Sequence, residues 1–373
     1  MRDFELETYF SRWEFNAKYN LAASDAESLS IASLLSMAGD DAEQALMSQW
    51  LGYTETWGAP QLREKIALTY HSLSQQNILC FHGAEEGIYT AMRVLLRPGD
   101  HAIVIVPNYQ AAETIPLEVA NVTGVALDAE QNWALDLNQV ADAIQPNTRL
   151  ISINFPNNPT GHIISRDTLD QLVSLCRENE IFLFSDEVYR LLELDDTKRL
   201  PQVADIYELG FSLNVMSKAY GLPGLRIGWI ASQQFDWLQK MERYKHYLSI
   251  CNSAPSEVLA DIALTHADKI LQQNRHIIRE NLLILDAFFK QYEQWFEWQM
   301  PDGGCIAFPK YLGSDGADSF CESLVKQKSV LLLPGKVYRS DLLTTPTSHF
   351  RIGFGRKNLP QALDLLTQFI DAK

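Results

Sequence analysis

Short apolar runs alternate with amphipathic stretches through the first two thirds of the chain. The runs are apolar throughout and do not alternate between apolar and polar positions, which is typical of strands buried on both faces of a mainly parallel sheet. The sequence therefore predicts an α/β fold in which helices flank such a sheet. The runs are "AIVIVP" at 102–107, "LISINFP" at 150–156, "IFLFSDEVY" at 181–189, "LNVMS" at 213–217 and "IGWIAS" at 227–232.

Three stretches carry a helical pattern. Residues 60–73 are predicted to be helical because Pro60 suits a first turn and apolar residues recur with helical spacing. The segment 167–178 is amphipathic. Residues 256–293 predict a long helical stretch with a break near His266.

The last third of the chain changes character. The segments "CIAFPKYL", "SVLLLPG" and "HFRIGFG" are separate strands between helices, which is more typical of a small α+β domain. We therefore predict a large domain at 40–265. A small domain would combine 1–39 with 266–373.

Conspicuous polar and aromatic residues follow the predicted strands. Because ligands of open α/β sheets bind beyond the carboxyl ends of the strands, these side chains are expected at one edge. Each has an ordinary alternative: an aspartate there often caps a helix, a lysine in a glycine-rich loop is usually solvated, and Asn-Pro-Thr-Gly is a common turn. Their concurrence predicts a binding site. The residues are Tyr109, Asn157, Asn158, Asp186, Tyr189 and Lys218.

Composition and charge exclude several classes of protein. Among the 373 residues 46% are hydrophobic, yet no apolar run approaches the ~18 residues of a membrane span. The first residues carry acidic side chains and no apolar core of a signal peptide. A net charge of −16 disfavours binding to nucleic acid or anionic lipid. Five scattered cysteines indicate reduced thiols in a cytoplasmic protein, and no zinc motif or histidine cluster predicts a metal.

A series of motifs along nearly the whole chain resembles one family. The sequence is similar to fold-type I pyridoxal-phosphate (PLP) enzymes of the class I/II aminotransferase family. The resemblance implies the PLP-transferase fold, PLP as cofactor, and an α-amino acid and a 2-oxo acid as substrates. The motifs are "YTETWGAPQLREKIA", "HGAEEG", "PNY", "NNPTG", "SDEVY", "SKAYGLPGLRIG" and "FRIGFG".

The resemblance assigns the residues around the cofactor ring. Lys218 matches the lysine that forms a Schiff base with PLP and afterwards moves the Cα proton. Asp186 matches the carboxylate facing the pyridine nitrogen, where an ion pair at about 4 Å is worth about 4 kcal/mol at an effective dielectric constant of about 20. Asn158 and Tyr189 match the pair that hydrogen-bonds the phenolic oxygen. Tyr109 matches the aromatic that stacks on the ring, and a core tyrosine is the alternative.

Phosphate binding is assigned to a helix N-terminus and a cation. The amides of Ala84 and Glu85 open a helix, and Arg226 supplies the positive charge. Ser217, just before the lysine, is expected to help. The chain departs from the family at Val215, where serine or glycine is usual, so the phosphate is expected to be held less tightly.

Two further residues bear on substrate and assembly. Arg351 matches the arginine that clamps the substrate α-carboxylate, with Asn158 beside it, and a structural ion pair is the alternative. Tyr53 matches a tyrosine that reaches the phosphate of a neighbouring subunit, which implies a homodimer with shared active sites. Local packing is its alternative. The aromatic N-terminal stretch 9–19 is more typical of core or dimer packing, with a cover over the site as the alternative.

These residues together predict a cytoplasmic PLP-dependent aminotransferase. The same set serves elimination and cyclisation, so a C–S lyase, an aminocyclopropane-carboxylate synthase or a capreomycidine-synthase-like enzyme is the alternative. A non-catalytic sensor is disfavoured because Lys218, Asp186 and Arg351 are all present and no basic DNA-binding segment accompanies them.

Overall fold

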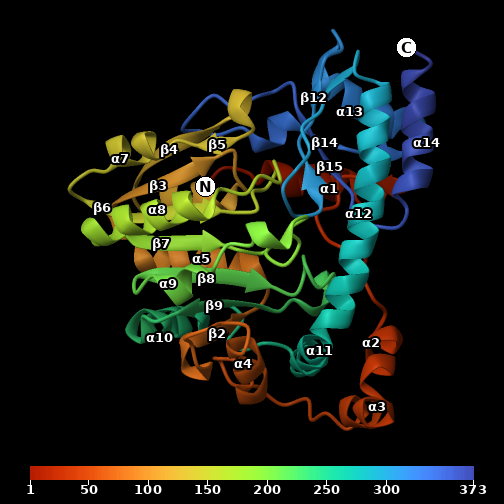
Figure 1. The fold of residues 1–373 in the computed structure, drawn as a ribbon. Helices are drawn as coiled ribbons and strands as arrows, with labels where there is room; N and C mark the ends of the chain where they lie inside the picture. Colours follow the sequence, from red (N-terminus) through yellow and green to blue (C-terminus); the bar gives the residue numbers. More distant parts are fainter.

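The centre of the molecule is an eight-stranded sheet. The computed structural model covers residues 1–373 and describes all of them except the side chain of Asp40. Figure 1 shows the strands of the sheet one above another, with the long helix α12 beside them on the side to which the strands β7 and β8 point. In sheet order the strands are β2 (Ile78–Phe81), β9 (Gly228–Ser232), β8 (Gly210–Val215), β7 (Phe182–Asp186), β6 (Thr148–Asn154), β3 (His101–Val106), β4 (Asn121–Asp128) and β5 (Ala134–Leu135).

The strands of the sheet are mainly parallel, as the sequence predicts. Strands β4, β3, β6, β7 and β8 pair in parallel, whereas β9 is antiparallel to both of its neighbours and β5 is antiparallel to β4. All five predicted runs form strands. Strands β2, β4 and β5 are missing from the prediction, because β2 has only four residues, β5 has only two, and β4 is largely half-exposed.

Both faces of the sheet are buried. In β7, Phe182 and Phe184 belong to one apolar core and Leu183 to the other. Helix α5 contributes Ile88 to the first core, and α8 contributes Leu172 to the second. Figure 1 shows α5 and α8 on opposite sides of the strands. The continuous apolar runs in the sequence follow from this two-sided burial.

Each of the three predicted helical stretches is helical, although one of them ends earlier than predicted. In chain order they are α1 (Glu5–Trp13), α2 (Ile31–Ala38), α3 (Asp40–Met47), α4 (Pro60–Ala67), α5 (Ala84–Leu95), α6 (Ala111–Leu117), α7 (Leu137–Ala143), α8 (Arg166–Glu178), α9 (Val203–Ile206), α10 (Phe235–Lys245), α11 (Ala254–Thr265), α12 (Ala267–Gln291), α13 (Gly316–Lys328) and α14 (Leu359–Ile370). The break near His266 is confirmed, since it separates α11 from α12.

Helix α4 ends earlier than predicted. The pattern extends to residue 73, but the helix stops at Ala67 and Leu68 is exposed. The backbone amides of His71 and Ser72 instead donate to Asp205 Oδ1, at 2.9 and 3.0 Å. A side chain far along the sequence therefore satisfies donors that a longer helix would have used.

The last third of the chain forms small sheets beside α12, α13 and α14. Its three-stranded sheet has the order β11 (Ile306–Ala307), β15 (Phe350–Gly353), β14 (Leu333–Pro334), and β10 (Phe296–Glu297) pairs with β12 (Lys310–Tyr311). The short β1 (Tyr19–Asn20) pairs with β13 (Val330–Leu331), which ties the N-terminal stretch to this region. Helices α2 and α3 also pack against α11. The domain boundaries given above stay a prediction.

None of the helices in the described part of the chain combines the length and the apolar character that crossing a bilayer would require.

Shortening a buried side chain of the central strand β8 should lower the stability of the protein substantially. Leu213 is fully buried between Asp186 of β7 and Ile230 of β9. Leu213→Ala should lower the free energy of unfolding by about 2–5 kcal/mol, because it leaves a cavity in a packed core. The matched control Leu283→Ala, at a leucine that is 71% exposed, should change it by less than about 0.5 kcal/mol. Urea unfolding followed by circular dichroism checks this, and equal losses in both variants would contradict it.

Candidate active site

A cavity of about 660 Å³ lies beyond the carboxyl ends of β6, β7 and β8. Helix α1 closes it from the opposite side, so the N-terminal stretch helps to form its wall. Of the residues predicted from the sequence to form the site, all but Asn157 and Tyr53 line this cavity. They are Ala84, Glu85, Tyr109, Asn158, Asp186, Tyr189, Ser217, Lys218, Arg226 and Arg351.

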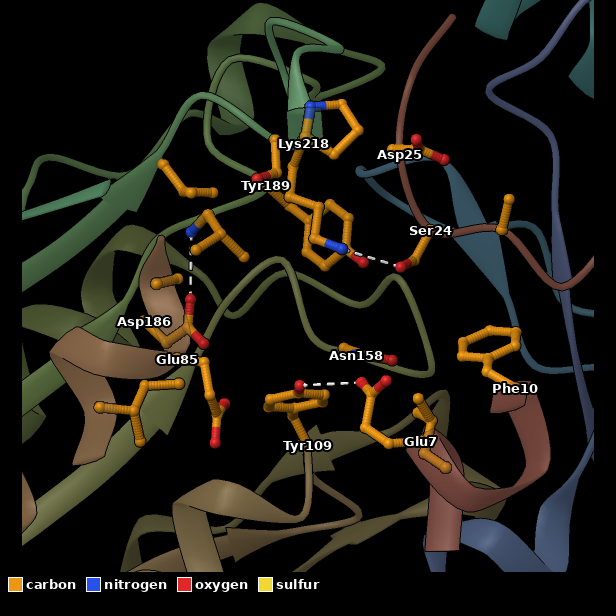
Figure 2. Close-up of a pocket in the computed structure, with 18 of the residues that line it drawn as sticks. Glu7, Phe10, Ser24, Asp25, Glu85, Tyr109, Asn158, Asp186, Tyr189 and Lys218 are labelled. Carbon is orange, nitrogen blue, oxygen red and sulfur yellow. Dashed lines mark hydrogen bonds between the residues drawn. The ribbon is translucent and has the colours of Figure 1, made fainter. Parts of the chain in front are cut away.

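Lys218 presents a buried amine to the cavity. It follows β8, and its Nζ donates to Ser24 Oγ at 2.8 Å (Figure 2). Burial lowers the pKa of Lys218, because the ammonium form is poorly solvated there. An amine with a lowered pKa is a better nucleophile and base at neutral pH.

Asp186 is the last residue of β7 and places a carboxylate deep in the same cavity. Its Oδ1 accepts a hydrogen bond from the backbone amide of Val188 at 3.2 Å. Burial raises the pKa of Asp186 to about 6. Among the described side chains it forms no ion pair. A cationic partner within the cavity would restore the ordinary ionised state.

Tyr189 carries a hydroxyl that lacks a partner. The side chain is 1% exposed, and among the described residues its oxygen has no hydrogen-bond partner. Burying a hydroxyl without a hydrogen bond costs free energy. Because Tyr189 lines the cavity beside Lys218, a bound molecule would satisfy it (Figure 2).

Arg351 places a buried guanidinium at the far end of the cavity. It comes from β15 and is 1% exposed. Its Nη1 donates to Tyr338 at 2.6 Å and to Asn158 Oδ1 at 3.1 Å, and its Nη2 donates to the carbonyl of Ala22 at 2.6 Å. Its Nε has no partner, and it pairs with none of the described carboxylates. A buried cation with only neutral partners favours an anionic ligand.

The start of α5 and the Arg226 side chain form an anion site. Gly83 precedes the helix with a φ of +86°, which favours glycine, and a Cβ there would fall 2.5 Å from Arg226 Nη2. The guanidinium therefore lies directly beside the helix N-terminus. Gly228 allows β9 to lie close to the start of α5, since a Cβ added to it would fall 3.0 Å from the amide nitrogen of Ala84. Backbone amides and a cation in this arrangement suit a phosphate group.

Tyr109 and Glu85 lie at the bottom of the cavity. The Tyr109 hydroxyl donates to Glu7 Oε1 at 3.3 Å, and its ring packs against Phe4 with centroids 5.0 Å apart. Burial raises the pKa of Glu85 to about 7, and its Oε2 is buried without a partner among the described residues. The stacking role of Tyr109 stays a prediction.

Three further residues that line or support the cavity are not predicted from the sequence. Ser24 contacts Lys218, Tyr338 holds Arg351, and Glu7 accepts from Tyr109. Of the aromatic stretch 9–19, Phe10 and Phe15 line the cavity, so part of it covers the site. A helical period in "FELETYFSRWEF" could have indicated that one face of α1 is buried, but not what it contacts.

Tyr53 lies outside this cavity. It is 84% exposed, in a surface segment with Met47, Trp50 and Leu51, which are also largely exposed. Within one subunit it therefore contributes nothing to the site.

The cavity offers a suitable protein group for each functional group of PLP. The Lys218 amine suits the aldehyde, and the α5 N-terminus with Arg226 suits the phosphate. The buried Asp186 carboxylate suits the pyridine nitrogen, and the unpartnered Tyr189 hydroxyl suits the phenolic oxygen. Val215, where the family has serine or glycine, lines the cavity with an apolar side chain, so it offers the phosphate no hydrogen bond.

Comparisons with known proteins agree with this fit. A profile of the family "Aminotransferase class I and II" matches residues 17–366. Capreomycidine synthase of Streptomyces vinaceus is 27% identical over 83% of this chain and 79% of its own length. An aspartate aminotransferase of Pyrococcus horikoshii is also 27% identical, over 80% of this chain and 78% of its own.

A solved structure resembles the chain over its whole length. A PLP-dependent aminotransferase from Streptococcus suis superimposes with a TM-score of 0.93 at 31% identity, and covers 100% of this chain and 98% of its own. The family match spans nearly every residue, and the cavity carries a fitting group for each part of the cofactor. The chain therefore belongs to the class I and II aminotransferase family and is an enzyme of its PLP-dependent type.

Proposed function

We propose that this enzyme transfers the amino group of an α-amino acid to a 2-oxo acid. The observation that carries the proposal is the presence of Lys218 and Arg351 in one cavity, one with a buried amine and the other with a buried guanidinium that lacks an anion. Arg351 would bind the substrate α-carboxylate, and Lys218 would act at the substrate Cα.

The cofactor would be held by groups that the fold positions in advance. Arg226 and the amides of Ala84 and Glu85 would bind the phosphate, and Asp186 and Tyr189 would contact the ring. When bound, PLP supplies an electron sink for the negative charge that develops at the substrate Cα. Asp186, as a buried anion, would strengthen that sink by keeping the ring nitrogen protonated.

The chain's own residues would orient the substrate and move its proton. Arg351 is fixed by Tyr338 and the Ala22 carbonyl, so a carboxylate on it has one orientation. Lys218 Nζ would take the Cα proton, and the lowering of its pKa by burial favours the uncharged amine that this step requires. Ser24 holds the same nitrogen by a hydrogen bond at 2.8 Å.

Cyclisation or elimination is the second candidate. The relative named capreomycidine synthase, at 27% identity over 83% of the chain, favours it. The proposed roles of Lys218, Asp186 and Arg351 serve both reactions equally. The two candidates differ in whether the amino group stays on the cofactor or leaves on a product.

The half-reaction separates the candidates. An amino acid given without any oxo acid should bleach the visible band of the bound cofactor, because transamination leaves the amino group on it. Pyridoxamine phosphate and about one oxo acid per subunit should accumulate, and added oxo acid should restore the band. Absorbance and product analysis measure both. Sustained release of ammonia, a thiol or a cyclic product, with the band persisting, would exclude transamination and leave the family assignment intact.

Asp186→Asn should separate stability from function. The folded-state pKa of Asp186 is raised from 3.8 to about 6, so the folded protein binds more protons than the unfolded chain between these values. The wild-type apoprotein therefore loses stability as pH rises through this window, by up to about 3 kcal/mol. The variant should avoid this loss and be more stable at pH 8, with the difference vanishing below about pH 4.

Turnover of the same Asp186→Asn variant, loaded with cofactor, should fall by orders of magnitude because the ring nitrogen loses its anionic partner. Urea unfolding of the apoproteins at both pH values and steady-state rates of the loaded enzymes check the two effects. A fall in turnover below about tenfold would count against the assigned role.

A homodimer with shared sites would explain the exposure of Tyr53. The segment around it bears exposed apolar side chains, and it lies next to a second such segment because Thr54 Oγ1 donates to the carbonyl of Asn252 at 2.9 Å. In that second segment Tyr247 is 89% exposed and Ile250 47%. We infer that a second copy covers these segments and that Tyr53 reaches the partner's phosphate site.

Mixed dimers test the reach of Tyr53. Heterodimers of Tyr53→Phe and Lys218→Ala subunits contain one site in which both residues are intact, if Tyr53 crosses the interface. Their activity should exceed that of either parent variant. If confirmed heterodimers show no recovery, Tyr53 does not serve the partner's site.

A further inference from the structure

Two carboxylates line the cavity on either side of Phe10 in the sequence, Glu7 in α1 and Glu14 directly after that helix. Glu7, Phe10 and Glu14 have the spacing of one helical face, and all three line the cavity. The Phe10 ring lies 5.9 Å from Arg351 Cζ. With a rise of about 1.5 Å per residue, Glu7 and Glu14 begin roughly 5 and 6 Å along the axis to either side of Phe10. Both carboxylates therefore lie near the place where a substrate would be held.

Neither carboxylate is neutralised by the protein. Glu7 has one side-chain partner among the described residues, the Tyr109 hydroxyl at 3.3 Å, and Glu14 has none. Neither forms an ion pair with a described side chain. Burial raises the pKa of Glu14 and the negative charge of Glu7 raises it further, whereas the nearby positive charge of Arg356 lowers it. Glu7 is exposed and Glu14 is half-buried, their like charges repel, and a cation bound between them would relieve that repulsion.

The cations that line the cavity are already committed. Arg356 pairs with Asp25 at 2.9 Å, and Arg226 lies beside the α5 N-terminus, where the phosphate would bind. Under the proposed function Arg351 takes the α-carboxylate and Lys218 serves as the base. No described cation in the cavity remains for a carboxylate on the substrate side chain. Such a side chain would instead face Glu7 and Glu14.

Independent observations show that this cavity is built for a ligand. Arg351 and Tyr189 are each 1% exposed, and Arg351 Nε and the Tyr189 hydroxyl have no partner among the described residues. With the α-carboxylate on Arg351 and the Cα proton directed at Lys218, the side of the cavity formed by α1 would remain for the substrate side chain. Figure 2 shows Glu7 and Phe10 on that side, across the cavity from Lys218.

We propose that the amino-acid substrate has a cationic side chain, a guanidinium or an ammonium, and that Glu7 and Glu14 bind its charge. This rests on the proposed function, because it takes Arg351 as the site of the α-carboxylate. It also names Glu7 and Glu14 as the residues that determine substrate specificity.

Matched substrates test the charge directly. Arginine and citrulline have nearly the same size and differ in the charge of the side-chain terminus. The same comparison for an ammonium uses lysine and Nε-acetyllysine. In the half-reaction without oxo acid, the rate constant per substrate concentration should be roughly 10- to 100-fold higher for the cationic member of one pair or both. The pair that shows the preference identifies the cation. Equal rates within both pairs, or a preference for aspartate, would overturn the proposal.

Charge-neutral variants test the two residues. In Glu7→Gln/Glu14→Gln the ratio of the rate for the cationic member to the rate for the neutral member should fall to within about threefold. The control is Glu5→Gln on the same helix, because Glu5 pairs with Arg339 at 3.4 Å and does not line the cavity. An unchanged preference in the double variant would overturn the role of α1.

Binding without turnover provides a second readout. In a Lys218→Ala background loaded with cofactor, calorimetry should show tighter binding of the preferred cationic amino acid than of its neutral partner. The difference should shrink with added salt and disappear when Glu7 and Glu14 are also neutralised. Failure of every amino acid to bleach the wild-type band would instead overturn the proposed function. Bleaching without discrimination between matched partners would leave that function standing and refute this inference alone.

Discussion

The site depends on charged groups that are buried without opposite charges. Asp186 and Lys218 end neighbouring strands, and Arg351 faces them from a strand of the C-terminal region. Burial shifts the pKa of Asp186 upward and that of Lys218 downward, each toward its neutral form. A bound molecule with a cationic ring nitrogen would stabilise the Asp186 carboxylate. Anionic groups on the same molecule or on its substrate would stabilise the positive charges of Lys218 and Arg351. The sheet and its flanking helices hold the three residues in place against that cost.

Parallel strand order explains why so much of the site could be predicted from the sequence. Strands β6, β7 and β8 are adjacent and point the same way, so the residues that follow them meet at one edge. An apolar run that is followed by Asn158, Asp186 or Lys218 therefore indicates, from the local sequence alone, that these residues lie at the edge of the sheet. The buried β-strands were predictable for the same reason, since both of their faces contact apolar cores.

The remainder of the site depends on contacts between distant segments, which no local pattern specifies. Ser24 lies 194 residues from Lys218, and yet its hydroxyl accepts a hydrogen bond from the Lys218 amine. Tyr338 and the Ala22 carbonyl fix Arg351 from opposite ends of the chain. The early end of α4 has the same origin, because its would-be donors are satisfied by Asp205, more than a hundred residues away. A helical period predicts a buried face but not the element that buries it.

The residues at the strand ends and the carboxylates on the α1 side of the cavity have different consequences for the reaction that the enzyme would perform. Under the proposed function the residues at the strand ends would bind the cofactor and move the Cα proton, and these tasks are common to transamination and cyclisation. Cyclisation also requires a nucleophile in the substrate side chain to return to the reacting carbons. If Glu7 and Glu14 hold a cationic terminus against α1, its nitrogen is kept away from those carbons and protonated, and so it is a poor nucleophile. The same two carboxylates that would select the substrate would therefore also favour transamination over ring closure.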